Sequence, residues 1–157
     1  VGGDEAPGAQ HVQVVSDGIF AGPTRAGAEA RATGAHAPAW RYRNLLRTAA
    51  MDGALMSPHE LDVALTFGNI EAAAGLNGGT PETHEVSRVL RATWAAFARS
   101  GDPANATIPT WPAYDGERRV LLISPTPRVA DGDVDGAALA VAGGLSDRMI
   151  DWFGVFS

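Results

Sequence analysis

The sequence predicts an α/β fold with few strands and flanking helices, and three stretches support this prediction. Large and charged residues alternate over 39–43, an apolar run spans 120–123, and an amphipathic helix begins at Pro81. Alternation with a period of two and short apolar runs are typical of strands. The predicted order is helix, strand, helix, helix, strand, helix, which gives a small sheet whose edges are difficult to shield from solvent.

Composition narrows the classes of protein that this chain can belong to. The 157 residues have the length of one domain, and 45% of them are hydrophobic, which is too apolar for intrinsic disorder. The absence of cysteine and lysine excludes disulfides, thiolate catalysis, cysteine-bound zinc and Schiff-base chemistry. A net charge of −6 without a basic block argues against a nucleic-acid partner. No apolar run is long enough to span a membrane.

The N-terminal third is expected to form a lead-in and one helix. Residues 1–11 are rich in Gly, Pro and acidic side chains and predict a loose lead-in. Ser16 and Asp17 are typical helix-start residues, because their oxygens accept otherwise unpaired amide protons. The helix predicted over 19–33 is expected to be interrupted at Pro23 and to end at Gly34.

The remaining elements follow from local start and stop signals. Pro58 can open a helix that continues through Phe67 and ends at Gly68-Asn69. The best helix begins at Pro81 with Thr80 as its cap, and Gly101 ends it. Its predicted apolar face consists of Val86, Leu90, Trp94 and Phe97. A last helix is predicted over 146–153.

Common catalytic and metal motifs are missing from the sequence. His59-Glu60 begins like the zinc-protease helix motif, but Val63 stands where the second histidine ligand would be. None of the serines lies in a Gly-x-Ser-x-Gly elbow, and no phosphate-binding glycine loop is present. We therefore expect no metal and no cofactor. His59 at a helix start is a candidate general base, although a surface or capping histidine explains the local pattern as well.

Four stretches taken together resemble the type-B carboxylesterase/lipase family, which includes cholinesterases and bacterial para-nitrobenzyl esterases. In the segment 58–69, His59 is followed after three positions by Asp62 and then by Phe67-Gly68-Asn69, as around that family's catalytic histidine. The other three stretches occur in the family's order. Residues 17–23 resemble its Asp-x-x-Phe-x-x-Pro segment, and residues 38–42 are similar to its Pro-Val-Tyr-x-Tyr strand. Residues 94–103, followed by 111–114, resemble its Trp-x-x-Phe-Ala-x-x-Gly-Asp-Pro and Trp-Pro-x-Tyr signature.

This resemblance implies that residues 1–157 are the C-terminal section of one α/β-hydrolase domain with an incomplete sheet. His59 would be the catalytic histidine of a serine ester hydrolase, and Asp62 would orient it. The resemblance makes Asp17 a helix cap. The nucleophilic serine and the triad acid would lie in a missing N-terminal part of the same enzyme, so the isolated chain is expected to be inactive. The substrate would be a small carboxylic ester, and nothing in the sequence indicates a compartment.

The sequence leaves two alternatives open. The chain can be a non-catalytic, cholinesterase-like domain of the same family, or a small independent α/β binding module. In the esterase reading, Phe67, Trp94, Phe97 and Trp111 are expected to be packing residues.

Overall fold

A computed structural model describes residue 8, residue 12 and residues 15–34 and 37–131. The chain divides into two compact units: 1–41 with 114–118 and 132–157, and 42–113 with 119–131. The predicted lead-in, apart from Gly8, and the predicted helix over 146–153 lie outside the described residues.

In the first unit, the described residues 17–32 form a continuous helical segment. It consists of the π-helical turn η1 (Asp17–Ala21) and the α-helix α2 (Gly22–Ala32). Pro23 stands in the first turn of α2, so the predicted interruption is a change from π to α geometry rather than a break. The helix stops at Ala32, two residues before the predicted Gly34.

The predicted helix start at Ser16 and Asp17 is wrong. Ser16 already has helical torsion angles and makes no capping hydrogen bond through its side chain. Asp17 lies inside the first turn and is 1% exposed, so it is a buried residue of the helix and does not stand at a solvated helix end.

The second unit contains a three-stranded sheet in the order β1-β2-β3. Its strands are β1 (Tyr42–Asn44), β2 (Val120–Ile123) and β3 (Arg128–Ala130). β1 runs parallel to β2, with Tyr42 opposite Leu121, and β2 runs antiparallel to β3. All four residues of β2 are buried, as expected for the central strand of a covered sheet.

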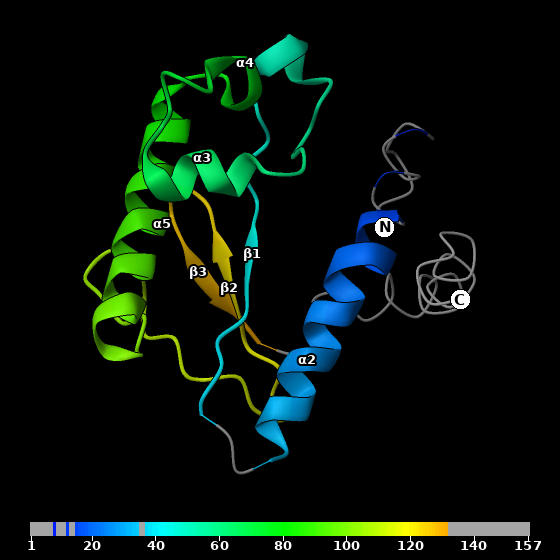
Figure 1. Cartoon of the computed structure of the whole chain (residues 1–157), viewed down its shortest axis with the longest axis vertical. Helices are drawn as coiled ribbons and strands as arrows, with labels where there is room; N and C mark the ends of the chain where they lie inside the picture. The colour runs from blue at the N-terminus through cyan, green and yellow to red at the C-terminus, as the bar shows by residue number, and fades with distance from the viewer. Residues whose placement is uncertain (1–7, 9–11, 13–14, 35–36, 132–157) are drawn as a thin grey trace. The chain divides into compact units, whose positions relative to one another are not determined.

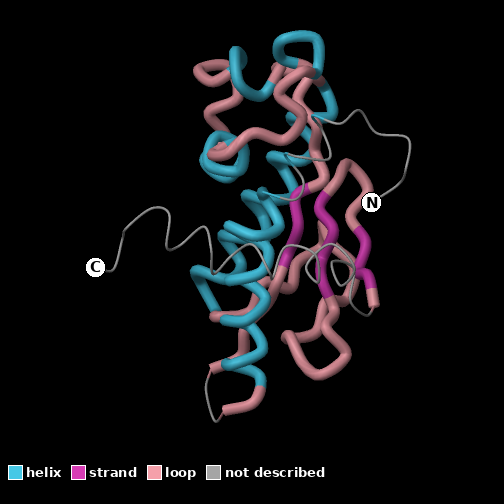
Figure 2. The backbone as a smooth tube through the Cα atoms, turned by 90° about the vertical axis from the view of Figure 1, so that its right-hand side faces the viewer, coloured by secondary structure: helices cyan, strands magenta, loops and turns pink. Residues whose placement is uncertain are grey.

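Helices line the sheet of the second unit and lie beyond one end of it. They are the 3-10 turn η2 (Ala50–Gly53), α3 (Leu61–Phe67), α4 (Ala74–Asn77) and the long α5 (Pro81–Ser100). Figure 1 and Figure 2 both show α5 running beside the strands, and α5 contacts β2. The α/β class predicted from the sequence is therefore confirmed, with β3, η2 and α4 as additional short elements.

The signals predicted for α5 are confirmed residue by residue. The Thr80 hydroxyl accepts a hydrogen bond from the Thr83 amide at 3.2 Å, and Pro81 occupies the first turn. Gly101 ends the helix with φ of 74°, a left-handed torsion that glycine adopts without strain. The helix start predicted at Pro58 is wrong, because Glu60 has φ of 69° and the helix begins at Leu61.

Candidate active site

The loop that leads from β1 to His59 is held by backbone hydrogen bonds. The Leu45 amide donates to the Ile123 carbonyl at 2.8 Å, which extends the contact between β1 and β2 into the loop. The Thr48 amide donates to the Met56 carbonyl at 2.7 Å, and this bond closes the loop before the histidine. Thr48 is 2% exposed, so this closure is anchored in the interior of the second unit.

His59 itself lies in a tight turn directly before α3, and its side chain is exposed. The Leu61 amide donates to the Pro58 carbonyl at 3.2 Å and so closes the turn around His59 and Glu60. Glu60 and Met56 both have a positive φ, which is uncommon for residues other than glycine. Strained torsions of this kind are concentrated at functional sites, although they do not by themselves show a function.

Asp62 lies in the first turn of α3 and is hydrogen-bonded to the last β-strand before the loop. The Tyr42 hydroxyl of β1 donates to Asp62 Oδ2 at 3.5 Å. Burial, and secondarily the Asp62 charge, raise the pKa of Tyr42. The Tyr42 ring also meets Trp94 of α5 edge to face, with 6.3 Å between ring centres. Tyr42 of β1 thus contacts both α3, through Asp62, and α5, through Trp94.

Sequence reasoning did not identify Tyr42 as a candidate site residue. Its signals were its place among the alternating large residues of the predicted strand and its position in the 38–42 stretch that resembles the family, and neither indicated a role in the site. The contact with Asp62 joins positions 20 residues apart, and local patterns do not reveal such a pairing.

Helix α3 is fixed to α5 by buried contacts. The Ser87 hydroxyl donates to the Leu65 carbonyl at 2.6 Å, and both residues are buried. Leu61, Val86 and Leu90 are also buried, each at 1% exposure or less. Because His59 and Asp62 lie at the N-terminal end of α3, this packing determines where both side chains can reach.

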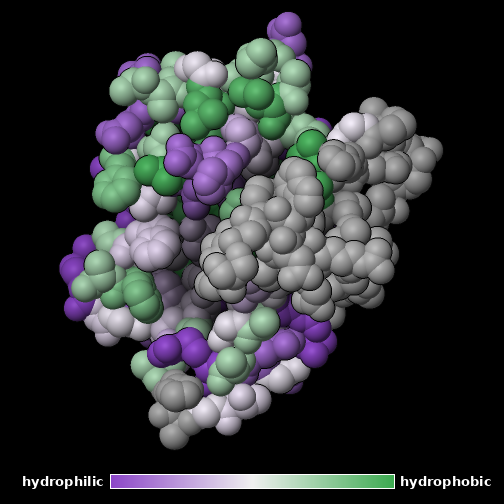
Figure 3. Space-filling model, turned by 45° about the vertical axis from the view of Figure 1, so that its right-hand side comes forward, coloured by the Kyte–Doolittle hydropathy of each residue, from purple (hydrophilic) through white to green (hydrophobic). Residues whose placement is uncertain are grey.

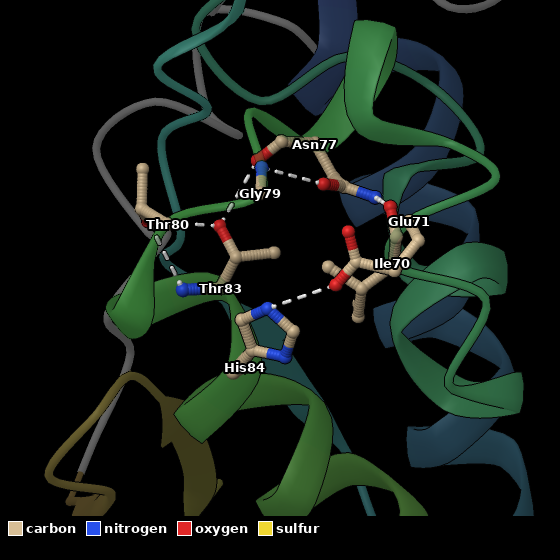
Figure 4. A network of polar contacts seen from close by, with 7 residues as sticks. All are labelled: Ile70, Glu71, Asn77, Gly79, Thr80, Thr83 and His84. Carbon is tan, nitrogen blue, oxygen red and sulfur yellow. Dashed lines mark hydrogen bonds and ion pairs between the residues drawn. The ribbon is translucent and has the colours of Figure 1, made fainter.

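A buried polar network joins the segment after α3 to the start of α5 (Figure 4). Asn77, which is 0% exposed, donates through Nδ2 to the Ile70 carbonyl at 2.9 Å and accepts from the Gly79 amide at 2.8 Å. The Thr83 hydroxyl donates to the Asn77 carbonyl at 3.0 Å. This network holds the return from α3 to α5 and thereby supports the helix that carries Asp62.

The other described histidine makes a surface contact. His84 Nε2 lies 3.5 Å from Glu71 Oε1, and both side chains are more than half exposed (Figure 4). His11 and His36 lie outside the described residues. Within 15–34 and 37–131, no group of three His, Cys, Asp or Glu side chains is arranged to hold a metal ion.

The four aromatic residues expected to be packing residues differ in burial. Trp111 is 7% exposed, in agreement with that expectation. Phe67 is 72% exposed, and Trp94 and Phe97 are 43% and 40% exposed, so the predicted packing role is wrong for Phe67 and only partial for the other two. Figure 3 shows hydrophobic residues at the surface between hydrophilic ones.

No helix in the described part of the chain combines the length and the apolar character needed to cross a membrane.

Comparison with known proteins identifies the family to which the chain belongs. A family model described as the carboxylesterase family matches residues 3–138, and the chain belongs to that family. Its relatives are carboxylesterases, so the family is enzymatic, and the resemblance noted in the sequence is confirmed.

Two curated relatives show the extent of the similarity. The chain is 31% identical over 114 residues to phenmedipham hydrolase of Pseudarthrobacter oxydans, a match that covers 70% of this chain and 23% of that protein. It is 28% identical over 130 residues to para-nitrobenzyl esterase of Bacillus subtilis (strain 168), covering 78% of this chain and 24% of that enzyme. The chain therefore spans about a quarter of the length of these relatives.

Solved structures confirm the fold. A carboxylesterase of Geobacillus stearothermophilus matches with a TM-score of 0.71 and 26% identity, over 88% of this chain and 29% of that chain. A thermophilic para-nitrobenzyl esterase matches with a TM-score of 0.70 and 23% identity, over 84% of this chain and 27% of that chain. The architecture is thus part of an α/β-hydrolase fold.

Proposed function

We propose that this chain supplies the catalytic histidine of a serine carboxylic ester hydrolase, and that His59 is this histidine. The observation that carries the proposal is the spacing of His59, Asp62 and Phe67-Gly68-Asn69 in a member of the carboxylesterase family. The structure adds that His59 lies exposed in a closed turn before α3, where its imidazole is accessible to reacting groups.

The proposed chemistry is acyl transfer through a serine. His59 Nε2 takes the proton of the serine hydroxyl as its oxygen attacks the ester carbonyl, and then gives that proton to the departing alcohol. In the second half of the cycle, His59 takes a proton from water, which attacks the acyl-enzyme, and returns it to the serine as the carboxylic acid leaves. Histidine suits both steps because its ordinary pKa lies near neutral pH.

Asp62 is proposed to position His59 from within α3. Its carboxylate accepts a hydrogen bond from the Tyr42 hydroxyl. This bond links β1, which precedes the His59 turn, to α3, which follows it. Substituting Asp62 by Asn keeps the size of the side chain but changes this acceptor, and should lower kcat less than loss of the imidazole does.

The nucleophile and the triad acid are proposed to lie in an N-terminal part of the same enzyme. This chain has no Gly-x-Ser-x-Gly elbow, and the matched part of it covers only 23% and 24% of two curated relatives. The 157-residue chain alone is therefore expected to show no turnover of a chromogenic ester. Turnover that His59→Ala removes would contradict this part of the proposal.

The role of His59 can be tested in a chimera. Residues 37–131 replace the matching section of the Bacillus subtilis para-nitrobenzyl esterase, and hydrolysis of a para-nitrobenzyl ester is measured. His59→Ala should lower kcat by about three orders of magnitude or more. His84→Ala, which removes an exposed histidine of the same unit, is the matched control and should leave kcat within about threefold, since surface changes have small effects. An active chimera that keeps its rate after His59→Ala would refute the assignment.

A further inference from the structure

A surface groove runs between α3 and α5 and includes none of the residues assigned to the proposed reaction. Its volume is about 720 Å³, and its walls include Phe67 of α3 and Arg88, Arg91 and Trp94 of α5. Phe67 is 72% exposed and Trp94 43% exposed, so two aromatic faces are available along it. Small-molecule sites commonly have volumes of about 300–1,000 Å³.

The floor of the groove is small and apolar. Ala92, Ala95 and Ala98 line it and leave space between the larger side chains. Trp94 is held in place by edge-to-face contacts with Tyr42 and Phe97, each with 6.3 Å between ring centres. A fixed aromatic ring beside an apolar floor favours a ligand with a hydrocarbon or aromatic body.

The two arginines of the groove differ in their partners. Arg88 donates through Nη2 and Nε to the carboxylate of Glu85, at 2.5 and 3.0 Å. Arg91 makes no hydrogen bond or ion pair within the described ranges, and it lies over Gly68, where a Cβ would come within 3.2 Å of its guanidinium carbon. An exposed guanidinium is a fork of donors that matches a carboxylate in geometry and charge.

We propose that this groove binds a small organic carboxylate with an apolar body, with the acid group on Arg91 and the body against Phe67 and Trp94. The size of the groove favours a small ligand over a protein, because eight residues line it and a stable protein interface uses about 20–30 residues a side. The proposal does not depend on the role of His59.

The test uses the 157-residue chain, 4-phenylbutanoate as the probe and 4-phenylbutanol as its neutral counterpart. Calorimetry should give saturable binding of the acid, with a Kd on the order of 1 mM for a ligand of this size. The alcohol should bind at least about tenfold more weakly, because it cannot pair with the guanidinium. In NMR spectra, the indole signal of Trp94, assigned with Trp94→Phe, should shift on addition of the acid.

Variants at exposed positions separate this site from general adsorption. Arg91→Gln should weaken binding of the acid by about tenfold or more, while binding of the alcohol should be unchanged. Phe67→Ala should weaken the binding of both compounds. Arg99→Gln, an exposed arginine of the same helix that does not line the groove, is the matched control.

Three results would overturn the proposal. They are absence of saturable binding of the acid, equal affinity for the alcohol, and an effect of Arg99→Gln equal to that of Arg91→Gln. None of them bears on the hydrolysis assigned to His59, so the two proposals fail separately.

Discussion

Replacing Asn77 by alanine should destabilise the protein more than its position outside the sheet suggests. The side chain is 0% exposed and makes two hydrogen bonds, to the Ile70 carbonyl and from the Gly79 amide. Ile70 is 4% exposed, so its carbonyl would remain buried without this partner, at about 1–3 kcal/mol. Gly79 is exposed, so water can replace part of the hydrogen bond that its amide loses. The loss of this bond should then lower the free energy of unfolding by about 0.5–1.5 kcal/mol.

The expected loss is therefore about 1.5–4.5 kcal/mol in the free energy of unfolding. It is measured by urea denaturation followed by circular dichroism, with the slope of the transition checked for constancy. Asn69→Ala is the matched control, because Asn69 is exposed, and it should change the free energy by less than about 0.5 kcal/mol. Equal effects of the two substitutions would refute the reasoning.

A second substitution tests the donor at this position directly. Asn77→Asp keeps the acceptor oxygen but replaces the amide donor, so a carboxylate oxygen faces the Ile70 carbonyl. Burial of this carboxylate should raise the pKa of the new aspartate above the ordinary value of about 3.9. The folded variant then binds a proton that the unfolded chain does not, so its stability relative to wild type should rise as the pH falls from neutral towards that value. A deficit that does not change with pH would contradict the proposed donor role.

Three further perturbations test the packing around the candidate site. Gly78→Ala should destabilise by about 1–3 kcal/mol, because φ is 78° and the new Cβ would lie 2.9 Å from the Ala49 amide nitrogen; thermal denaturation measures this loss. Leu65→Ala should lower the free energy of unfolding in urea by about 2–5 kcal/mol, since Leu65 is 0% exposed and its loss leaves a cavity. The raised pKa of Tyr42, caused first by burial and then by Asp62, predicts stability that is present below pH 10 and is lost as the pH rises through the higher folded value. Tyr42→Phe should reduce that decline in unfolding experiments between pH 9 and 11.5, and an unchanged decline would contradict the assignment.

Elements that depend on local rules could be predicted from the sequence. Helix α5 was predicted with its cap, its proline and its terminal glycine, because each acts on neighbouring residues. The turn at Glu60 was not predicted, since a glutamate with positive φ has no sequence signal. Strand β3 has three residues, too few to show a period, and it is identified by its antiparallel pairing with β2.

The candidate site was predicted only in part for the same reason. The resemblance of segment 58–69 to the family's histidine segment indicated His59 and Asp62, because residues on one turn and one helix keep fixed offsets. Tyr42 and Ser87 reach that segment from 20 and 22 residues away, through contacts that arise only when β1 and α5 pack against α3. The exposure of Phe67 was also missed, since an apolar residue at helical spacing normally faces a core.

The parallel pairing of β1 with β2 has a consequence for how the second unit forms during synthesis. Tyr42 and Leu121 are neighbours in the sheet but lie 79 positions apart in the chain, and His59 belongs to the stretch between them. Closing so long a stretch is a slow, non-local step. On the ribosome, Leu45 cannot form its hydrogen bond with Ile123 until β2 has emerged. Until then, only the packing of α3 against α5 can hold the histidine segment in place.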